Sequence, residues 1–130
     1  MASVLIVDDE PDVRNALKIL LRPAGHEMAE ASDAESALSL MAEGTPPAVV
    51  LCDVHLREGP NGLWLADRIR ERHPTTAMIL ATGDASVPPV QSLRKGIIAY
   101  LLKPFRREDV IRAVEDGILW SNAEAKKSSA

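Results

Sequence analysis

The sequence has little that could cross-link the fold or bind a nucleic acid. It contains one cysteine, so no internal disulfide can form, and Cys52 lies within an apolar run, where a thiol behaves as a small hydrophobe. The formal net charge of -4 argues against direct nucleic-acid binding, because phosphate backbones are neutralised by clustered lysine and arginine. Aromatic residues make up only 3% of the chain and hydrophobic residues 46%, so the core must be aliphatic.

Long apolar runs are also missing. No stretch approaches the roughly 20 residues that a membrane-spanning helix needs, so we expect no contact with a membrane. Met1-Ala2-Ser3 leads directly into a short apolar run, without a charged leader or a cleavage site. Together with a reduced cysteine, this start predicts a cytoplasmic protein. A chain of 130 residues is long enough to bury the core of a single domain.

Two apolar runs end in aspartates. The run 3–7 stops at Asp8 and Asp9, and the run 48–52 stops at Asp53. Both runs are short and valine-rich, which is typical of strands that are buried on both faces of a parallel sheet. Because parallel strands end at the same edge of their sheet, the sequence predicts that three carboxylates meet there.

The rest of the chain alternates between extended and helical patterns. We expect strands over 4–7, 26–31, 48–53, 77–81 and 97–102, and helices that begin near 11, 35, 63, 88 and 105. An acidic cap over 8–10 and a capping box over 32–35 mark the first two helix starts. This alternation predicts an α/β fold with an open parallel sheet covered on both faces. We expect one domain over 1–120 and a polar tail over 121–130, which is frayed or begins a linker.

Two further strands end in chemically useful side chains. Thr82 follows the run 77–81, and Lys103 follows the run 97–102. Like charges 4 to 5 Å apart repel by roughly 3 to 4 kcal/mol at an effective dielectric near 20, so three clustered carboxylates need compensation. Lys103 can neutralise one of them, and Mg2+ suits the rest because it binds few carboxylates and keeps several waters. A carboxylate can also attack phosphorus and form an aspartyl phosphate.

From Val4 to about Trp120 the chain resembles the receiver domains of two-component response regulators. The resemblance rests on five features: an acidic pair (Asp8 and Asp9), a phosphoacceptor (Asp53), a switch hydroxyl (Thr82), a switch aromatic (Tyr100) and a lysine with its following proline (Lys103 and Pro104). It implies a flavodoxin-like (CheY-like) doubly wound sheet of five parallel strands in the order 2-1-3-4-5, with five helices.

The resemblance also implies the chemistry of the site. Asp53 would accept a phosphoryl group from a sensor histidine kinase or a histidine phosphotransfer protein. Lys103 would contact the phosphoryl oxygens, and the peptide bond before Pro104 would be cis. Mg2+ would be held by the carboxylates of Asp9 and Asp53 and by the backbone carbonyl of His55. Asp8 would act mainly through water. The protein would catalyse only its own phosphorylation and dephosphorylation.

The same resemblance implies how the phosphoryl group becomes a signal. Thr82 would move toward it, Tyr100 would turn inward, and a surface would change. That surface would comprise the expected helix over 88–95, the strand over 97–102 and the last helix. A downstream protein would bind there, and the sequence leaves open whether a second copy of the chain does.

Some positions depart from the usual family pattern or tune it. Many receivers have a proline where this chain has Arg57, and the loop after Asp53 is slightly longer than usual. His55 and Asp84 occupy positions that influence how fast the phosphoryl group is lost in the family. The sign of the effect of Asp84 stays open, because a carboxylate there could position or repel water.

Two other functions compete with this interpretation, and a third alternative concerns the output of the receiver. A Mg2+-dependent phosphohydrolase of the haloacid-dehalogenase type also uses a strand-end aspartate, but it needs a second acid where this chain has His55. A flavin carrier would need a Ser/Thr/Gly-rich loop after the first strand, where the acids over 8–10 would repel the phosphate. The chain could also be a receiver fragment of a longer regulator, with an effector domain after Trp120.

Overall fold

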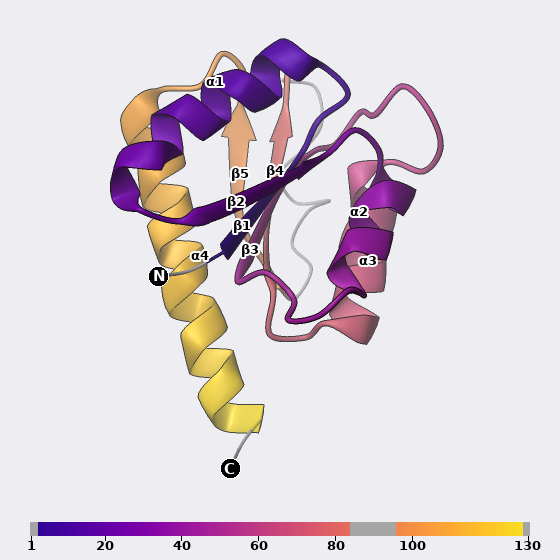
Figure 1. Ribbon diagram of the computed structural model, residues 1–130, viewed down its shortest axis with the longest axis vertical. Coiled ribbons are helices and arrows are strands. Elements are labelled where there is room, and N and C mark those ends of the chain that lie inside the picture. Colours follow the sequence, from indigo (N-terminus) through magenta and orange to yellow (C-terminus); the bar gives the residue numbers. More distant parts are fainter. Residues whose placement is uncertain (1–2, 84–95, 129–130) are drawn as a thin grey trace.

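The computed structural model describes residues 3–83 and 96–128, which form a parallel sheet with helices on both faces (Figure 1). The sheet has five strands in the order β2-β1-β3-β4-β5, and every neighbouring pair is parallel. This confirms the expected doubly wound architecture and strand order. The strands are β1 (Ser3–Val7), β2 (Glu27–Ala31), β3 (Val49–Asp53), β4 (Ala77–Thr82) and β5 (Ile97–Leu102).

The helices lie in two layers, with α1 and α4 on one face of the sheet and α2 and α3 on the other (Figure 1). A 3-10 turn, η1, follows α1. The fifth helix that we expected, over 88–95, lies outside the described residues. The helical segments are α1 (Pro11–Leu21), η1 (Arg22–Ala24), α2 (Ala34–Met41), α3 (Gly62–Arg72) and α4 (Arg107–Ser128).

The sheet separates two aliphatic cores. Along β1, Val4 and Ile6 pack on the side of α1 and α4, and Leu5 and Val7 pack on the side of α2 and α3. All five residues of β3 are buried, as the continuous apolar run predicts. Burial of each aliphatic side chain stabilises the folded state by roughly 1.5–3 kcal/mol. This packing holds the strands in register and so fixes the positions of the residues at their ends. Cys52 is one of these buried residues, and burial raises the pKa of its thiol well above the usual value.

The first two helices begin differently from the expected caps. The side chain of Glu10, at the N-cap of α1, accepts no capping hydrogen bond there. Instead, Asp8 Oδ1 accepts the Glu10 N–H at 2.9 Å and tightens the turn before the helix. At α2 the cap is Asp33 and not Ser32: Asp33 Oδ1 accepts the Ser36 N–H at 2.7 Å, and this bond lowers the pKa of Asp33. A carboxylate is the stronger acceptor for a helix N-terminus.

The end of α4 lies where we expected a tail that is frayed or begins a linker. The helix continues to Ser128 and projects past the body of the domain (Figure 1), so the residues from 121 to 128 are helical and not frayed. Ser121 is buried, and its hydroxyl donates a hydrogen bond to the carbonyl of Thr75 at 2.5 Å. Residues 123–127 are alanine, glutamate and lysine, which favour helix. The packing of α4 against the rest of the domain therefore reaches Ser121.

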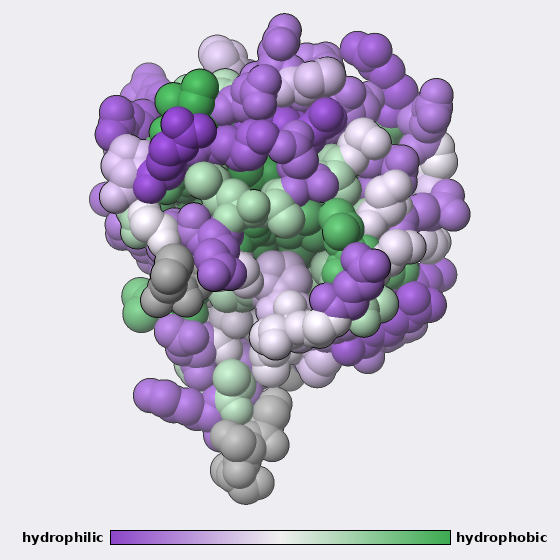
Figure 2. Space-filling model, in the orientation of Figure 1, coloured by the Kyte–Doolittle hydropathy of each residue, from purple (hydrophilic) through white to green (hydrophobic). Residues whose placement is uncertain are grey.

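The edge strand β2 borders an apolar hollow. Figure 2 shows a green band near this edge between hydrophilic surfaces, and a groove of about 210 Å³ there is lined by side chains that include Met28, Leu40 and Met41. Because Ser3 and Glu27 also line it, the groove lies toward the amino ends of β1 and β2, away from the strand-end acids.

Among the described helices, none has the length and apolar character of a membrane span.

Candidate functional site

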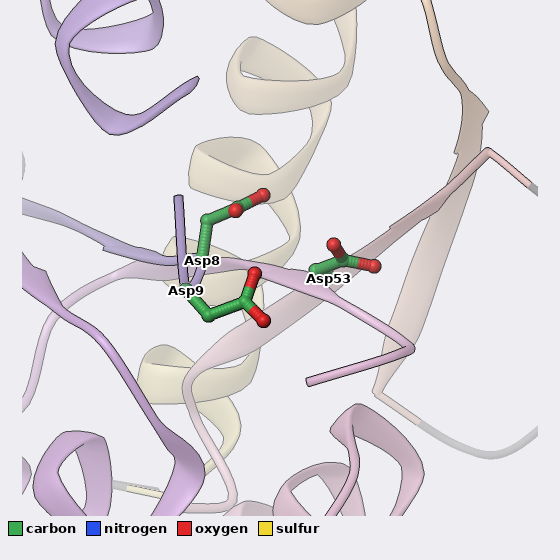
Figure 3. Close-up of side chains that lie close together, drawn as sticks. All are labelled: Asp8, Asp9 and Asp53. Carbon is green, nitrogen blue, oxygen red and sulfur yellow. The ribbon is translucent and has the colours of Figure 1, made fainter. Parts of the chain in front are cut away.

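Three carboxylates meet at the carboxyl edge of the sheet, as the sequence predicts. Asp8 and Asp9 follow β1, and Asp53 ends the neighbouring strand β3 (Figure 3). Each acid offers an oxygen, and these atoms lie within 4.8 Å of one another. Asp8 and Asp53 are only 3% and 7% exposed, so water screens their repulsion poorly.

Lys103 supplies a counter-charge to two of the acids. Its Nζ lies 3.0 Å from Asp8 Oδ2 and 2.8 Å from Asp53 Oδ2. Burial raises the pKa of Asp8 despite its hydrogen bonds. Burial also acts to lower the pKa of Lys103, but the hydrogen bonds to both carboxylates outweigh it, so the net shift is upward and the ammonium stays charged. The peptide bond between Lys103 and Pro104 is cis, which confirms that expectation.

The backbone near Asp53 is closely packed. The His55 N–H donates to Asp53 Oδ1 at 3.1 Å, so both oxygens of this carboxylate have a donor. The side chain of His55 is exposed. A Cβ on Gly62 would lie only 2.6 Å from the Asp53 carbonyl oxygen, which means that glycine is needed where α3 begins against β3.

A second network holds the loop after β1. Arg14 Nη1 donates to the carbonyl of Asp8 at 2.6 Å, and its Nε pairs with Glu30 Oε1 on β2 at 2.7 Å. Lys18, one turn further along α1, also pairs with Glu30. Hydrogen bonds from Lys18 and then Arg14 lower the pKa of Glu30. This network was not predicted from the sequence, although the spacing of Arg14 and Lys18 places both cations on one face of α1.

Arg57 contacts the remaining acid. Its backbone N–H donates to Asp9 Oδ2 at 3.0 Å, and its Nε lies 3.4 Å from the same oxygen. Its Nη2 lies 3.4 Å from Glu10 Oε1. The sequence marks Arg57 as a departure from the family pattern, but nothing in the sequence indicates that the β3–α3 loop folds back onto the β1–α1 loop.

The two expected switch residues lie on β4 and β5. Thr82 ends β4 and is fully buried, and its carbonyl accepts the Lys103 N–H at 2.8 Å. Tyr100 is half-buried in β5, packs against the core on the side of α2 and α3, and has a buried hydroxyl. Asp84 lies outside the described residues. The fold therefore brings Thr82 next to the strand that carries Asp53 and gives Tyr100 a partly buried setting.

The donor set fits a hard divalent cation. Oxygen ligands from carboxylates are the ones that Mg2+ prefers. The ammonium of Lys103 offsets one of the three charges of Asp8, Asp9 and Asp53, and two remain for a divalent ion and the surrounding cations. A carboxylate held beside an ammonium and a metal site can also take up a phosphoryl group, whose oxygens need the same positive charges.

Comparison with known proteins identifies the family. The response regulator receiver domain family matches residues 4–115. The aerobic respiration control protein ArcA of Escherichia coli (strain K12) is 36% identical over 111 residues, which cover 85% of this chain and 46% of ArcA. The crystal structure of NtrX from Brucella abortus has a TM-score of 0.87 at 31% identity, and the match covers 98% of this chain and 29% of NtrX.

A match of nearly the whole length of both chains comes from a response regulator receiver domain protein (CheY-like) of Methanospirillum hungatei JF-1. Its TM-score is 0.85 at 26% identity, and it covers 95% of this chain and 98% of that one. The chain belongs to the response regulator receiver domain family of two-component signalling. Phosphorylation of an aspartate and the use of Mg2+ are general features of this family. The chain spans about a quarter to about half of the length of several curated relatives.

Proposed function

We propose that this receiver domain accepts a phosphoryl group on Asp53 in a Mg2+-dependent reaction. The observation that carries the proposal is the shared ammonium: Lys103 Nζ lies within 3.0 Å of both Asp8 and Asp53, beside the third acid. This arrangement supports the proposal, because three carboxylates and a fixed cation lie together at the carboxyl edge of the sheet. Receiver domains are not classical enzymes, and here the protein itself is the phosphorylated product.

The chemical step is a transfer to a carboxylate oxygen of Asp53. That oxygen forms a bond to phosphorus, while the bond from phosphorus to the donor breaks and the donor leaves with its electron pair. For a phosphohistidine donor, the bond that breaks is P–N, and the imidazole takes a proton. Lys103 then pairs with the phosphoryl oxygens, where its positive charge offsets the charge that the transfer brings.

Mg2+ would be held by Asp9, Asp53 and the backbone carbonyl of His55, with Asp8 acting mainly through water. The ion supplies charge neutralisation for the incoming phosphoryl oxygens. The Arg14 contact to the Asp8 carbonyl and the Glu10 N–H contact to its carboxylate fix this acid from both ends. We assign to the exposed His55 side chain, and to Asp84, an influence on phosphoryl loss.

The signal would pass through Thr82 and Tyr100 to the surface of β5, α4 and the segment 88–95. Phosphorylation adds about -1.5 to -2 charge, which draws the Thr82 hydroxyl inward and favours an inward Tyr100. On the described part of this surface, a groove of about 500 Å³ runs along β5 and α4. A sensor histidine kinase or a phosphotransfer protein would supply the phosphoryl group, and a downstream protein would bind here.

The length of the relatives favours a receiver that works within a longer regulator. NtrX and PilR relatives extend far beyond the region that matches this chain, which spans 25% and 28% of their lengths. The helical residues 121–128 then form the first part of a connection to an effector domain. A stand-alone receiver is the alternative, and the position of the stop codon in the gene distinguishes the two.

The experiment is incubation with acetyl phosphate and Mg2+, followed by intact mass. We expect a gain of one phosphoryl group in the wild type and none in Asp53→Asn. Asp67→Asn, on the exposed face of α3, is a control with the same chemical change. A gain that persists in Asp53→Asn, or turnover of ordinary phosphoesters by the wild type, would contradict the proposal and favour a phosphohydrolase.

A further inference from the structure

Two cations form ion pairs with the three acids of the site. Lys103 pairs with Asp8 and Asp53, and Arg57 pairs with Asp9. The Asp9 side chain is only 16% exposed, whereas that of Arg57 is 75% exposed. Arg57 is therefore a solvent-accessible cation that reaches inward onto a largely covered carboxylate.

The contact of Arg57 joins two loops. Its backbone N–H and its Nε both contact Asp9 Oδ2, and its Nη2 contacts Glu10 Oε1. Arg57 belongs to the β3–α3 loop, and its two partners belong to the β1–α1 loop. An ordinary exposed ion pair is worth about 0–1 kcal/mol, so the pair adds little to stability. Its importance is that one partner is a member of the candidate metal site.

We propose that Arg57 is a tethered competitor of Mg2+ at Asp9. The guanidinium pairs with Asp9 Oδ2, so a divalent ion that uses this carboxylate competes with it. The competition lowers the affinity for Mg2+, and metal binding moves the guanidinium off Asp9 while its contact with Glu10 still links the two loops. This inference rests on the proposed function, because it assumes that Mg2+ uses Asp9.

The geometry also indicates which part of the contact would change. The backbone N–H of Arg57 is fixed by the loop and can stay on Asp9 Oδ2 while the guanidinium leaves. The freed guanidinium keeps Glu10 as a partner, since Glu10 is half exposed and lies 3.4 Å from Nη2. Mg2+ binding would thus move the Arg57 side chain away from Asp9 without unfolding the loop.

The test is a Mg2+ titration of three proteins by calorimetry at low ionic strength. Arg57→Gln removes the guanidinium and keeps the backbone N–H, so we expect it to bind Mg2+ about two- to fivefold more tightly than the wild type. The control, Arg72→Gln, makes the same change of net charge at the exposed last turn of α3, far from the helix start that abuts Asp53. It should bind Mg2+ as the wild type does.

A second readout follows Arg57 itself. In an NMR titration, the side-chain Nε–H of Arg57 should shift with the same midpoint as the calorimetric binding, and the Arg57 amide should shift less. Equal or weaker Mg2+ binding by Arg57→Gln, or an equal gain in Arg72→Gln, would overturn the inference while leaving the proposed function intact. Failure of every variant and of the wild type to bind Mg2+ would overturn the proposed metal site instead.

Discussion

At the scale of single residues, Lys103 decides whether the acidic cluster is tolerable. Its ammonium bridges Asp8 and Asp53, whose carboxylates are nearly excluded from water. Two like charges in such a setting repel strongly unless a cation lies between them. In the proposed function the same cation would receive the phosphoryl oxygens, so both stability and phosphoryl transfer would depend on one side chain.

Replacing that cation gives the first prediction. Lys103→Met keeps much of the apolar stem but leaves two buried carboxylates facing each other, so we expect the free energy of unfolding at neutral pH to fall by about 1–3 kcal/mol. Saturating Mg2+ should recover part of the loss, because the ion supplies positive charge at the same acids. Urea denaturation with and without Mg2+ measures both effects. Lys127→Met, at the exposed end of α4, should change little, and equal losses in the two variants would refute the explanation.

At the scale of elements, the strand ends were predictable and the loop contacts were not. The runs before Asp8, Asp53 and Lys103 are apolar and short, so the parallel sheet and its topology place their last residues together. Asp9 joins the cluster because it follows Asp8 directly. The contact of Arg57 with Asp9 depends on the path of an irregular loop, which no periodicity encodes.

Helix starts were harder to predict from sequence than strand ends. Asp33 and Ser32 are both good caps, and only the backbone geometry at Asp33 decides between them. The extent of α4 was missed because residues 121–128 have no apolar stripe, although their helix-forming composition and the bond from Ser121 to Thr75 carry the helix on. A helix-forming composition without an apolar stripe was the signal in the sequence for this extension of α4.

The network of Arg14, Lys18 and Glu30 gives a prediction for pH dependence. The pKa of folded Glu30 lies below its usual 4.5, so its ion pairs stabilise the fold above that pH, and the stabilisation is lost as the pH falls through the lowered pKa. Glu30 is about one-third exposed, so we expect Glu30→Gln to cost only about 0.5–1 kcal/mol at neutral pH. Below the lowered pKa the two proteins should unfold alike.

The control for this change is Glu27→Gln, an exposed residue of the same strand with the same loss of charge. Thermal unfolding of all three proteins across the acid range gives the comparison. A difference between wild type and Glu30→Gln that stayed constant down to the lowest pH would show that the carboxylate charge is not the cause.

At the scale of the whole molecule, the site is made by segments that lie far apart in the chain. Asp8 and Lys103 are separated by 95 positions, and only the completed sheet brings them together. A ligand that binds these residues in the folded state and not in the unfolded chain must stabilise the entire domain.

Mg2+ should therefore raise the unfolding free energy in a concentration-dependent way. At a free concentration ten times the dissociation constant, the expected gain is about 1.4 kcal/mol. Asp9→Asn should abolish most of it, because this residue would be a direct ligand, whereas Asp67→Asn should retain it. Chemical denaturation at several Mg2+ concentrations gives the measurement. A stabilisation by Mg2+ that survived in Asp9→Asn would place the ion elsewhere.

The uninterrupted course of α4 has a mechanical consequence. Ser121 is buried and bonds to Thr75, so only the last part of α4, about 10 Å from Ser121 to Ser128, can act as a lever arm on the packed body of the domain. A tilt of about 5° at Ser121 would move the end of the helix by roughly 1 Å. A change in how α4 packs on the sheet would thus displace the end of the helix while the strands keep their places.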